Sequence, residues 1–340
     1  MGGSKASPDT LAELPVATPA ETAWRPARFG EFEAIVRSFE RTGGNPALLR
    51  SPKVASLVIS GNKVLGANEV PGVHVEAQEL EHGVQVKVIV EPGTRLERPA
   101  HLCFGVIPAE GVQEILSEFE IGEGAKAEFI AHCTFPNAVK VRHLMEAKIH
   151  VGREAEMIYR ETHYHGETGG VEVIPKAEVA VDEGGRYTSE FVLTTGRVGK
   201  LAFDYVVDVA ARGVAELVVK AYGSGDDAIT VKETIHLNGE RARGLAKSRI
   251  ALRDRATAEV IGATEGNAPY ARGHVDCIEI VRDQAVANAV PIVRVRDDRA
   301  HVTHEAAIGT VNKKELETLM ARGLDEEEAV DVIIRGMLEA

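Results

Sequence analysis

Short runs in which apolar and polar residues alternate dominate the chain between residues 52 and 311. They include VASLVIS, GVQVKVIV, KAEFIAHC, LVVKAY and NAVPIVRVR, and each ends in a turn of glycine, asparagine, aspartate or charged residues. Alternation with a period of two is typical of strands that bury one face. The pattern therefore predicts an all-β core domain over 52–311.

A turn phrase within this region recurs about every 30 residues. It reads IGEGAKAEFI from Ile121, VGREAEMIYR from Val151 and VDEGGRYTSE from Val181, with looser echoes from Leu252 and Val281. A repeat that cannot bury its own apolar face must stack on its neighbours. The spacing therefore favours a β-solenoid whose successive turns of chain, or rungs, share one core. A β-sandwich of equal strand number is the structural alternative.

Helical spacing replaces alternation before residue 52. The segment 24–51 is predicted to be helical, and apolar residues lie on one face of a helix from Trp24 to Glu40: Phe29, Phe32, Ile35, Val36 and Phe39. Such a face should dock on a neighbouring element. Residues 1–23 are rich in Ala, Pro and Thr and have neither a basic start nor an apolar run. We expect a disordered tail there and no signal peptide.

The segment 312–340 is predicted to form two further helices. The first runs from Asn312 to Arg322 and ends at Gly323, and Asp325 with Glu328 forms the cap of the second. The second helix is apolar on more than one side. Either it packs on the end of the solenoid as a simple cap, or part of its apolar surface is covered by a partner.

Composition narrows the class of protein. A chain of 340 residues with 44% apolar content can bury a large core, and a formal net charge of −13 argues against nucleic acid as the main partner. No segment reaches membrane-spanning length. The three cysteines, Cys103, Cys133 and Cys277, are far apart in the chain, which favours free thiols in a reducing cytosol. We therefore expect a cytoplasmic protein.

The cysteines differ in their surroundings. Cys103, in HLCFG, is interpreted as a packing residue, and Cys133 precedes a proline turn where partial exposure is plausible. Cys277 follows His274 by three residues, and the pair His304-Glu305 should lie on a nearby rung. Thiolate, imidazole and carboxylate together suit zinc or iron.

A competing metal site could be built on His163 and His165, because alternate residues of a strand share a face. Glu167 follows too closely for a cupin site, so a structural or surface role is favoured for this pair. No nucleophile elbow, phosphate-binding loop or dinucleotide fingerprint occurs.

Several segments together resemble the SufB/SufD family of iron-sulfur cluster assembly proteins, in the short form typical of archaeal systems. They are NPALLRSPKVASLVISG, CTFP, EGNAPYARGHVDC, VRDDRAHVTHEAAIG and ELETLMARGLDEEEAVDVIIRGML. The resemblance extends over nearly the whole chain from Trp24. It implies a right-handed parallel β-helix between helical ends, and so favours the solenoid over the sandwich.

The resemblance also implies a function. In this family two β-helix subunits pair, each binds a SufC-type ABC ATPase through its C-terminal helices, and a transient iron-sulfur cluster is built at the subunit interface. Cys277 matches the scaffold cysteine, Glu305 the carboxylate of the His-Glu-Ala motif, and His304 the histidine of a SufD partner. Cys133 resembles the cysteine that accepts sulfur, which then passes through the β-helix to the scaffold cysteine.

Partners follow from the same resemblance. The candidate face for the ATPase consists of Met320, Leu324, Ile333, Ile334 and Met337. Because the chain retains both Cys277 and Glu305, a homodimer with two copies of the site is predicted, and a heterodimer with a paralogue is the alternative. Apo iron-sulfur proteins would receive the cluster, and whether a flavin takes part is left open. The chain is thus predicted to be a scaffold and not an enzyme. The alternatives are a SufD-like platform without a cluster and a metalloenzyme that uses His163 and His165.

Overall fold

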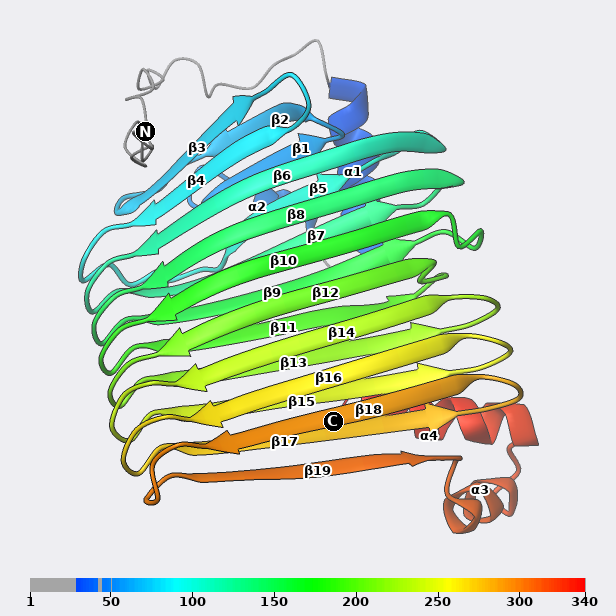
Figure 1. Ribbon diagram of the computed structural model, residues 1–340. Helices are drawn as coiled ribbons and strands as arrows, with labels where there is room; N and C mark the ends of the chain where they lie inside the picture. Colours follow the sequence, from blue (N-terminus) through cyan, green and yellow to red (C-terminus); the bar gives the residue numbers. More distant parts are fainter. Residues whose placement is uncertain (1–28, 42–44, 50, 340) are drawn as a thin grey trace, which may run out of the picture.

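The computed structural model describes residues 29–41, 45–49 and 51–339, and its body is a stack of strands coiled into two facing sheets (Figure 1). The strands are β1 (Ser56–Ser60), β2 (Lys63–Asn68), β3 (Val73–Glu79), β4 (Val84–Val90), β5 (Ala100–Gly105), β6 (Glu110–Ile121), β7 (Lys126–Phe135), β8 (Lys140–Val151), β9 (Glu156–His165), β10 (Val171–Val181), β11 (Arg186–Thr195), β12 (Lys200–Val209), β13 (Val214–Gly223), β14 (Ala228–Leu237), β15 (Arg243–Leu252), β16 (Thr257–Gly266), β17 (Arg272–Val281), β18 (Val286–Val295) and β19 (His301–Gly309).

Successive strands alternate between the two sheets. One sheet has the order β19-β17-β15-β13-β11-β9-β7-β5-β1-β2, and the other β18-β16-β14-β12-β10-β8-β6-β4-β3. From β4 and β5 onward, each strand pairs in parallel with the strand two places along the chain, for example β10 with β12. Val151 pairs with Val181, and Val181 with Val209, so these rungs take 30 and 28 residues. The predicted β-solenoid with helical ends is confirmed, and the sandwich is excluded.

The alternation of the sequence becomes the alternation of inside and outside. In β12, for instance, Leu201, Phe203 and Val207 point into the solenoid and are at most 2% exposed. Their neighbours Ala202 and Val206 face outward and are partly exposed. Mainly Val, Ile, Leu, Ala and Phe from the two inner faces form one continuous core. Since every rung buries its apolar face against the rungs beside it, the repeat is stable only as a stack.

The recurring turn phrase follows the end of a strand in one sheet and leads into the next strand, which belongs to the other sheet. The turns that follow Ile121, Val151 and Val181 each hold one residue in the left-handed region, namely Gly124, Glu154 and Gly184 with φ of 67°, 53° and 69°. The amide of each donates to a carbonyl in the turn of the next rung, over 2.9 to 3.0 Å. The echoes from Leu252 and Val281 lie at the opposite edge of the solenoid, where β15 leads to β16 and β17 to β18. They are therefore a different turn.

The first strands depart from parallel stacking, because β1 pairs with β2, and β3 with β4, in antiparallel register. The alternating pattern of apolar and polar residues does not predict these antiparallel pairs. Beside them lie α1 (Phe29–Arg41) and the short α2 (Pro46–Leu49). Phe32, Ile35, Val36 and Phe39 of α1 are buried against the outer face of the sheet, as their spacing predicted. Residues 24–28 of the expected helix, the side chain of Phe29 and the predicted tail 1–23 lie outside the described residues.

The two C-terminal helices are α3 (Lys313–Met320) and α4 (Glu326–Glu339), and their predicted caps are present. The Asn312 side chain accepts hydrogen bonds from two amides of α3. The Asp325 side chain accepts a hydrogen bond from the backbone amide of Glu328 at 2.8 Å, and the Glu328 side chain accepts one from the amide of Asp325 at 3.0 Å. This reciprocal pair is a capping box. Gly323 between the helices has a φ of 102°. None of the described helices is long and apolar enough to cross a membrane.

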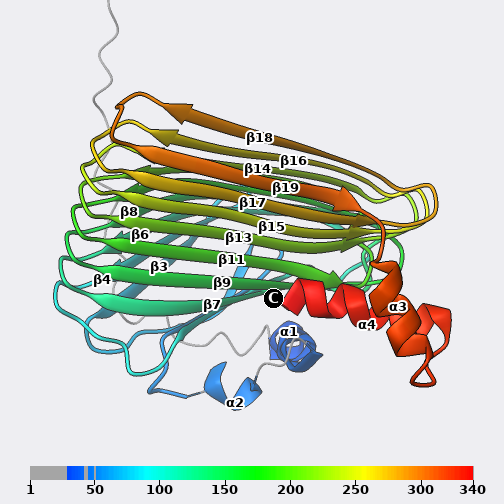
Figure 2. The same cartoon turned by 90° about the horizontal axis from the view of Figure 1, so that it is seen from below.

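The α4 helix packs on the side of the solenoid and not on its end (Figure 2). Val330, Ile334 and Leu338 form a small core with Ala251 of β15. Tyr222 and Ile280 border this core from β13 and β17. The last rung, which consists of β18 and β19, therefore has no helix across its end.

Candidate functional site

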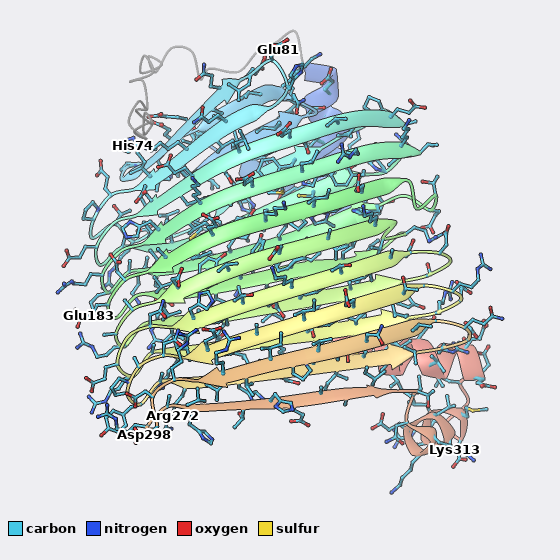
Figure 3. The ribbon with its side chains drawn as sticks, in the orientation of Figure 1. His74, Glu81, Glu183, Arg272, Asp298 and Lys313 are labelled. Carbon is cyan, nitrogen blue, oxygen red and sulfur yellow. The ribbon has the colours of Figure 1, made fainter. Side chains whose placement is uncertain are left out.

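The terminal rung exposes both strand edges and apolar side chains. Strands β18 and β19 are the last strands of their sheets, so each leaves one edge unpaired within the described chain. In Figure 3, Arg272 and Asp298 mark one end of this rung, and Lys313 marks α3 at the other. The exposed large apolar residues of the rung are Val286, Val290, Ile292, Val293, Val295 and Ile308. Exposed edges with such side chains are typical of surfaces that pair with another chain.

Cys277 lies one strand inside this edge, on β17. Its side chain points into the solenoid and is 0% exposed. It faces Gly262 of β16, where an added Cβ would lie 3.7 Å from the Cys277 sulfur. On β19 the residue paired with Cys277 is Ala306. The scaffold candidate is therefore covered by the terminal rung.

The register separates the three predicted ligands. His304 pairs with Val275, whereas Glu305 pairs with Asp276. Because side chains alternate along a strand, His304 shares the interior face with Cys277, while Glu305 is on the outer face. Both His304 and Glu305 are exposed because they belong to the last strand. The structure thus places all three on the two last strands of one sheet, but does not gather them into one group within a single chain.

The surroundings of Cys277 favour the protonated thiol. Burial raises the pKa of Cys277 to about 11, with smaller contributions from the negative charges of Glu279 and Glu233. The neighbouring hydroxyl of Ser248, which pairs in register with Cys277, opposes this shift. Burial also raises the pKa of Glu233 well above its ordinary value and that of Glu279 to about 7. A thiolate at this position needs a cation or a change in exposure.

A second group of polar side chains lies in the middle of the solenoid. Cys133 is on β7, His143 is on β8 of the opposite sheet, and Glu161, His163 and His165 are on β9. We call these five residues the interior cluster, and each is at most 1% exposed. Cys133 was expected to be partly exposed, and a surface role was considered for the histidine pair; both expectations are wrong. Four of the five side chains point inward from one sheet, and His143 reaches them from the other.

Hydrogen bonds connect four members of the interior cluster. Glu161 Oε1 is 2.6 Å from His163 Nε2 and accepts from the Cys133 thiol over 3.8 Å. His163 Nδ1 is 3.3 Å from His165 Nε2, and His165 Nδ1 is 2.9 Å from the carbonyl of Arg197. Within the described residues, neither ring nitrogen of His143 has a hydrogen-bond partner. One ligand atom each of Cys133, His143 and His163 lie within 4.8 Å of one another.

Burial governs the protonation of this cluster. It lowers the pKa of His143, His163 and His165 to about 3, so all three imidazoles are neutral at pH 7. Burial also raises the pKa of Glu161. The nearby His143 and hydrogen bonds from Tyr159 and Cys133 act in the opposite direction and lower it. Burial, helped by the negative charge of Glu161, also raises the pKa of the Cys133 thiol well above its ordinary value.

Sequence reasoning missed His143 and Glu161. Glu161, His163 and His165 are alternate residues of one strand and therefore point to the same side. The alternation could thus have predicted that the Glu161 carboxylate points inward. His143 is on the neighbouring strand of the other sheet, and its approach depends on how the two sheets face each other. Cys103 is separate from both groups, because it lies on the outer face beneath α1 and has the packing role expected of it.

Further polar side chains lie inside the solenoid between Cys133 and Cys277. Tyr159, Tyr187, Ser189 and Tyr205 are within or next to the rungs of the interior cluster, and Glu233 and Ser248 are near Cys277. Tyr205 pairs in register with Glu233. The core is thus interrupted by polar groups on most of the rungs that separate the two cysteines.

The predicted ATPase-docking residues divide into two sets. Ile334 is 3% exposed and belongs to the core between α4 and β15, so its assignment to a docking face is wrong. Met320 is 42% exposed, and Leu324, Ile333 and Met337 are partly exposed. Ile333 and Met337 line a groove of about 510 Å³ between the C-terminal helices and the ends of β17 and β19, with Ile308 on its other wall.

Comparison with known proteins gives one family. Residues 116–337 match the family model described as SUF system FeS cluster assembly, SufBD core domain. The chain is 37% identical over 309 residues to a SufBD family protein of Methanocaldococcus jannaschii, covering 91% of this chain and 98% of that one. It is 38% identical to a SufBD family protein of Pyrococcus horikoshii, covering 91% and 94%. It is 23% identical to SufB of Bacillus subtilis, covering 74% and 54%. The chain therefore belongs to the SufBD family of iron-sulfur cluster assembly proteins.

Proposed function

We propose that the chain is the scaffold subunit of a SufBC-type complex, which builds a nascent iron-sulfur cluster at a subunit interface and is driven by a SufC-type ABC ATPase. One observation carries the proposal. Cys277, His304 and Glu305 all lie on the last two strands of one sheet, at the exposed end of the solenoid and beside the C-terminal helices. Thiolate is the preferred ligand of iron-sulfur clusters, and a mixed ligand set suits a cluster that must be released.

The proposed interface is between two copies of the terminal rung. Within one chain Cys277 and Glu305 project from opposite faces of the sheet, so they cannot bind the same cluster without help from a second chain. The unpaired edges of β18 and β19, with their exposed apolar side chains, supply a self-complementary surface for a two-fold dimer. Each cluster would then take Cys277 from one subunit and Glu305 or His304 from its partner.

Because Cys277 is buried, its thiol would have to be exposed before it could bind a cluster. Strand β19 continues through residues 310–312 directly into α3, so movement of α3 and α4 would displace the rung that covers Cys277. We propose that the ATPase binds Ile333 and Met337, which line the groove beside β19, together with the exposed Met320 and the partly exposed Leu324. ATP-dependent movement would then expose the thiol while the cluster is built.

Cys133 is proposed as the acceptor of sulfur, which would move through the solenoid towards Cys277. The polar side chains on the intervening rungs support such a route, because they supply hydrogen-bonding groups inside an otherwise apolar core. Apo iron-sulfur proteins are the proposed recipients of the finished cluster.

A SufD-like platform without a cluster is the second candidate function. It is favoured by the complete burial of Cys277 and by the raised pKa of its thiol. A metalloenzyme centred on His163 is less well supported, because His143, His163 and His165 are at most 1% exposed and leave no access for a substrate.

Thiol labelling tests the ATPase-driven exposure. In a variant with Cys103→Ala and Cys133→Ala, Cys277 is the remaining thiol. We expect slow reaction with a maleimide in the isolated chain, because the thiol is buried and protonated. With the SufC-type ATPase and ATP we expect the rate to rise at least about tenfold, as the terminal rung moves.

The control is the same experiment with a nonhydrolysable ATP analogue or with an ATPase variant that cannot bind ATP. An equal labelling rate with and without ATP would contradict the proposed movement. It would leave the SufD-like platform as the better description.

A further inference from the structure

The interior cluster contains more ligand-type atoms than sulfur transfer through Cys133 requires. Its hydrogen bonds fix the protonation of each ring. The carbonyl of Arg197 can only accept, so His165 Nδ1 donates to it over 2.9 Å. With its Nδ1 donating, the uncharged ring of His165 has its lone pair on Nε2, and His163 Nδ1 donates to this lone pair over 3.3 Å. The lone pair of the neutral His163 is therefore on Nε2.

This lone pair faces a second acceptor. His163 Nε2 is 2.6 Å from Glu161 Oε1, and a lone pair and a carboxylate oxygen this close require a cation between them. In the absence of metal, a proton between Glu161 and His163 satisfies the contact. A metal ion can replace this proton.

Two further groups converge on the same place. The Cys133 sulfur is 3.8 Å from the same Glu161 oxygen. His143 reaches across from the opposite sheet, is 0% exposed, and has no hydrogen-bond partner on either ring nitrogen among the described residues. An imidazole buried without partners is costly, and a metal bond would satisfy its lone pair.

The charge balance of the cluster points to a divalent ion. Among the described residues, the buried basic side chains are Lys220 and Arg249, and they pair with Glu190 and Asp276 elsewhere in the solenoid. No basic side chain therefore neutralises a thiolate and a carboxylate at the cluster within the described chain. One divalent cation balances these two negative charges and leaves the site neutral in the dry core.

We propose that Cys133, His143, His163 and Glu161 bind one divalent transition-metal ion of the zinc or ferrous class. The ligand atoms of the first three lie within 4.8 Å of one another, whereas tetrahedral coordination requires about 3.3–3.8 Å, a difference that small side-chain rotations close. One sulfur, two nitrogens and one oxygen are a common ligand mixture for these ions. His165 then acts as the outer partner that orients His163.

Aromatic rings enclose the proposed site and exclude water. Phe135 lies 4.9 Å from His143 and Phe191 lies 4.8 Å from His163, measured between ring centroids. Binding would release the thiol proton of Cys133 and the carboxyl proton of Glu161. The bound Cys133 would be a thiolate, which is the form that a sulfur acceptor needs. The metal site does not rest on the proposed scaffold function.

The test uses the full-length chain expressed in minimal medium with added Co²⁺, because a buried site is loaded as the chain folds. We expect about one cobalt ion per chain, with the visible bands of tetrahedral Co²⁺ and a sulfur-to-cobalt charge-transfer band. His143→Leu should lower the metal content at least about tenfold, and Cys133→Ala should abolish the charge-transfer band. Displacement by Zn²⁺ or Fe²⁺ then ranks the two ions.

Two matched controls are Cys103→Ala, which removes a buried thiol beneath α1, and His236→Ala, which removes a histidine of β14 outside the interior cluster. Both should keep the wild-type metal content and spectrum. His143→Gln, checked with circular dichroism, serves if His143→Leu fails to fold. The proposal is overturned if wild type binds no more cobalt than the His143 variants, or if the charge-transfer band depends on Cys277. A persistent cobalt spectrum in a protein that builds no cluster would refute only the scaffold function.

Discussion

Anaerobic reconstitution of the Cys277→Ala variant with iron and sulfide, in the presence of the proposed SufC-type ATPase, is expected to give no iron-sulfur charge-transfer absorbance, whereas wild type should develop it. The physical reason is that Cys277 is the thiol nearest the exposed terminal rung, and thiolate is the preferred ligand of an iron-sulfur cluster. The structural effect of removing one buried sulfur should be small, about 1 kcal/mol of unfolding free energy. Absorbance and acid-labile sulfide are the measurements.

Two variants make the comparison specific. Cys103→Ala removes an equally buried thiol beneath α1 and should leave the cluster intact. His163→Ala should lose only the mononuclear ion of the interior cluster and keep the labile sulfide. Loss of the iron-sulfur cluster in His163→Ala alone would support a metalloenzyme. A wild-type protein that builds no iron-sulfur cluster would support the SufD-like platform.

A lysine in the terminal rung is expected to weaken the proposed dimer. Ile292 and Val293 of β18 are 40% and 38% exposed on the last strand of their sheet. In a two-fold interface each substitution occurs twice, so Ile292→Lys or Val293→Lys places two charges in one apolar contact. We expect the dimer to weaken at least about tenfold. Sedimentation velocity measures this directly.

Val139→Lys is the matched control. Val139 is 59% exposed in the turn before β8, far from the terminal rung, so its replacement should leave the dimer unchanged. Dimers of equal strength in all three variants would show that the terminal rung is not the interface.

The repeated pattern of the sequence favoured the solenoid, and the family resemblance decided between the solenoid and the sandwich. Alternation specifies which side chains point inward, and the spacing of Ile121, Val151 and Val181 matches the rung length of 30 residues. Helix ends were also predictable, because such signals are local: Gly323 lies between the two helices, and the Asp325–Glu328 pair caps the second. These features depend on residues close together in the chain.

The site could be predicted only in part, because it depends on register between distant strands. A shift of one residue moves a side chain to the other face. Pairing of Cys277 with Ala306 thus separates Cys277 from Glu305, although both were correctly expected on neighbouring strands. His143 meets Cys133 and His163 only because two sheets face each other. Ile334 was expected to bind a partner because its helix is apolar on several sides. In the structure its side chain packs instead against Ala251 of β15.

The central claim is that the cluster is shared between two copies of the chain. It can be tested with a mixed dimer that contains one Cys277→Ala subunit and one Glu305→Ala subunit, purified through two different tags. If the ligands come from different subunits, this dimer retains one complete site and loses the other.

We predict that the mixed dimer builds about half as much cluster per dimer as wild type, while dimers of either variant alone build none. Labile sulfide and iron per dimer after anaerobic reconstitution provide the measurement. A mixed dimer with no more cluster than the two pure variants would contradict a site formed across the interface.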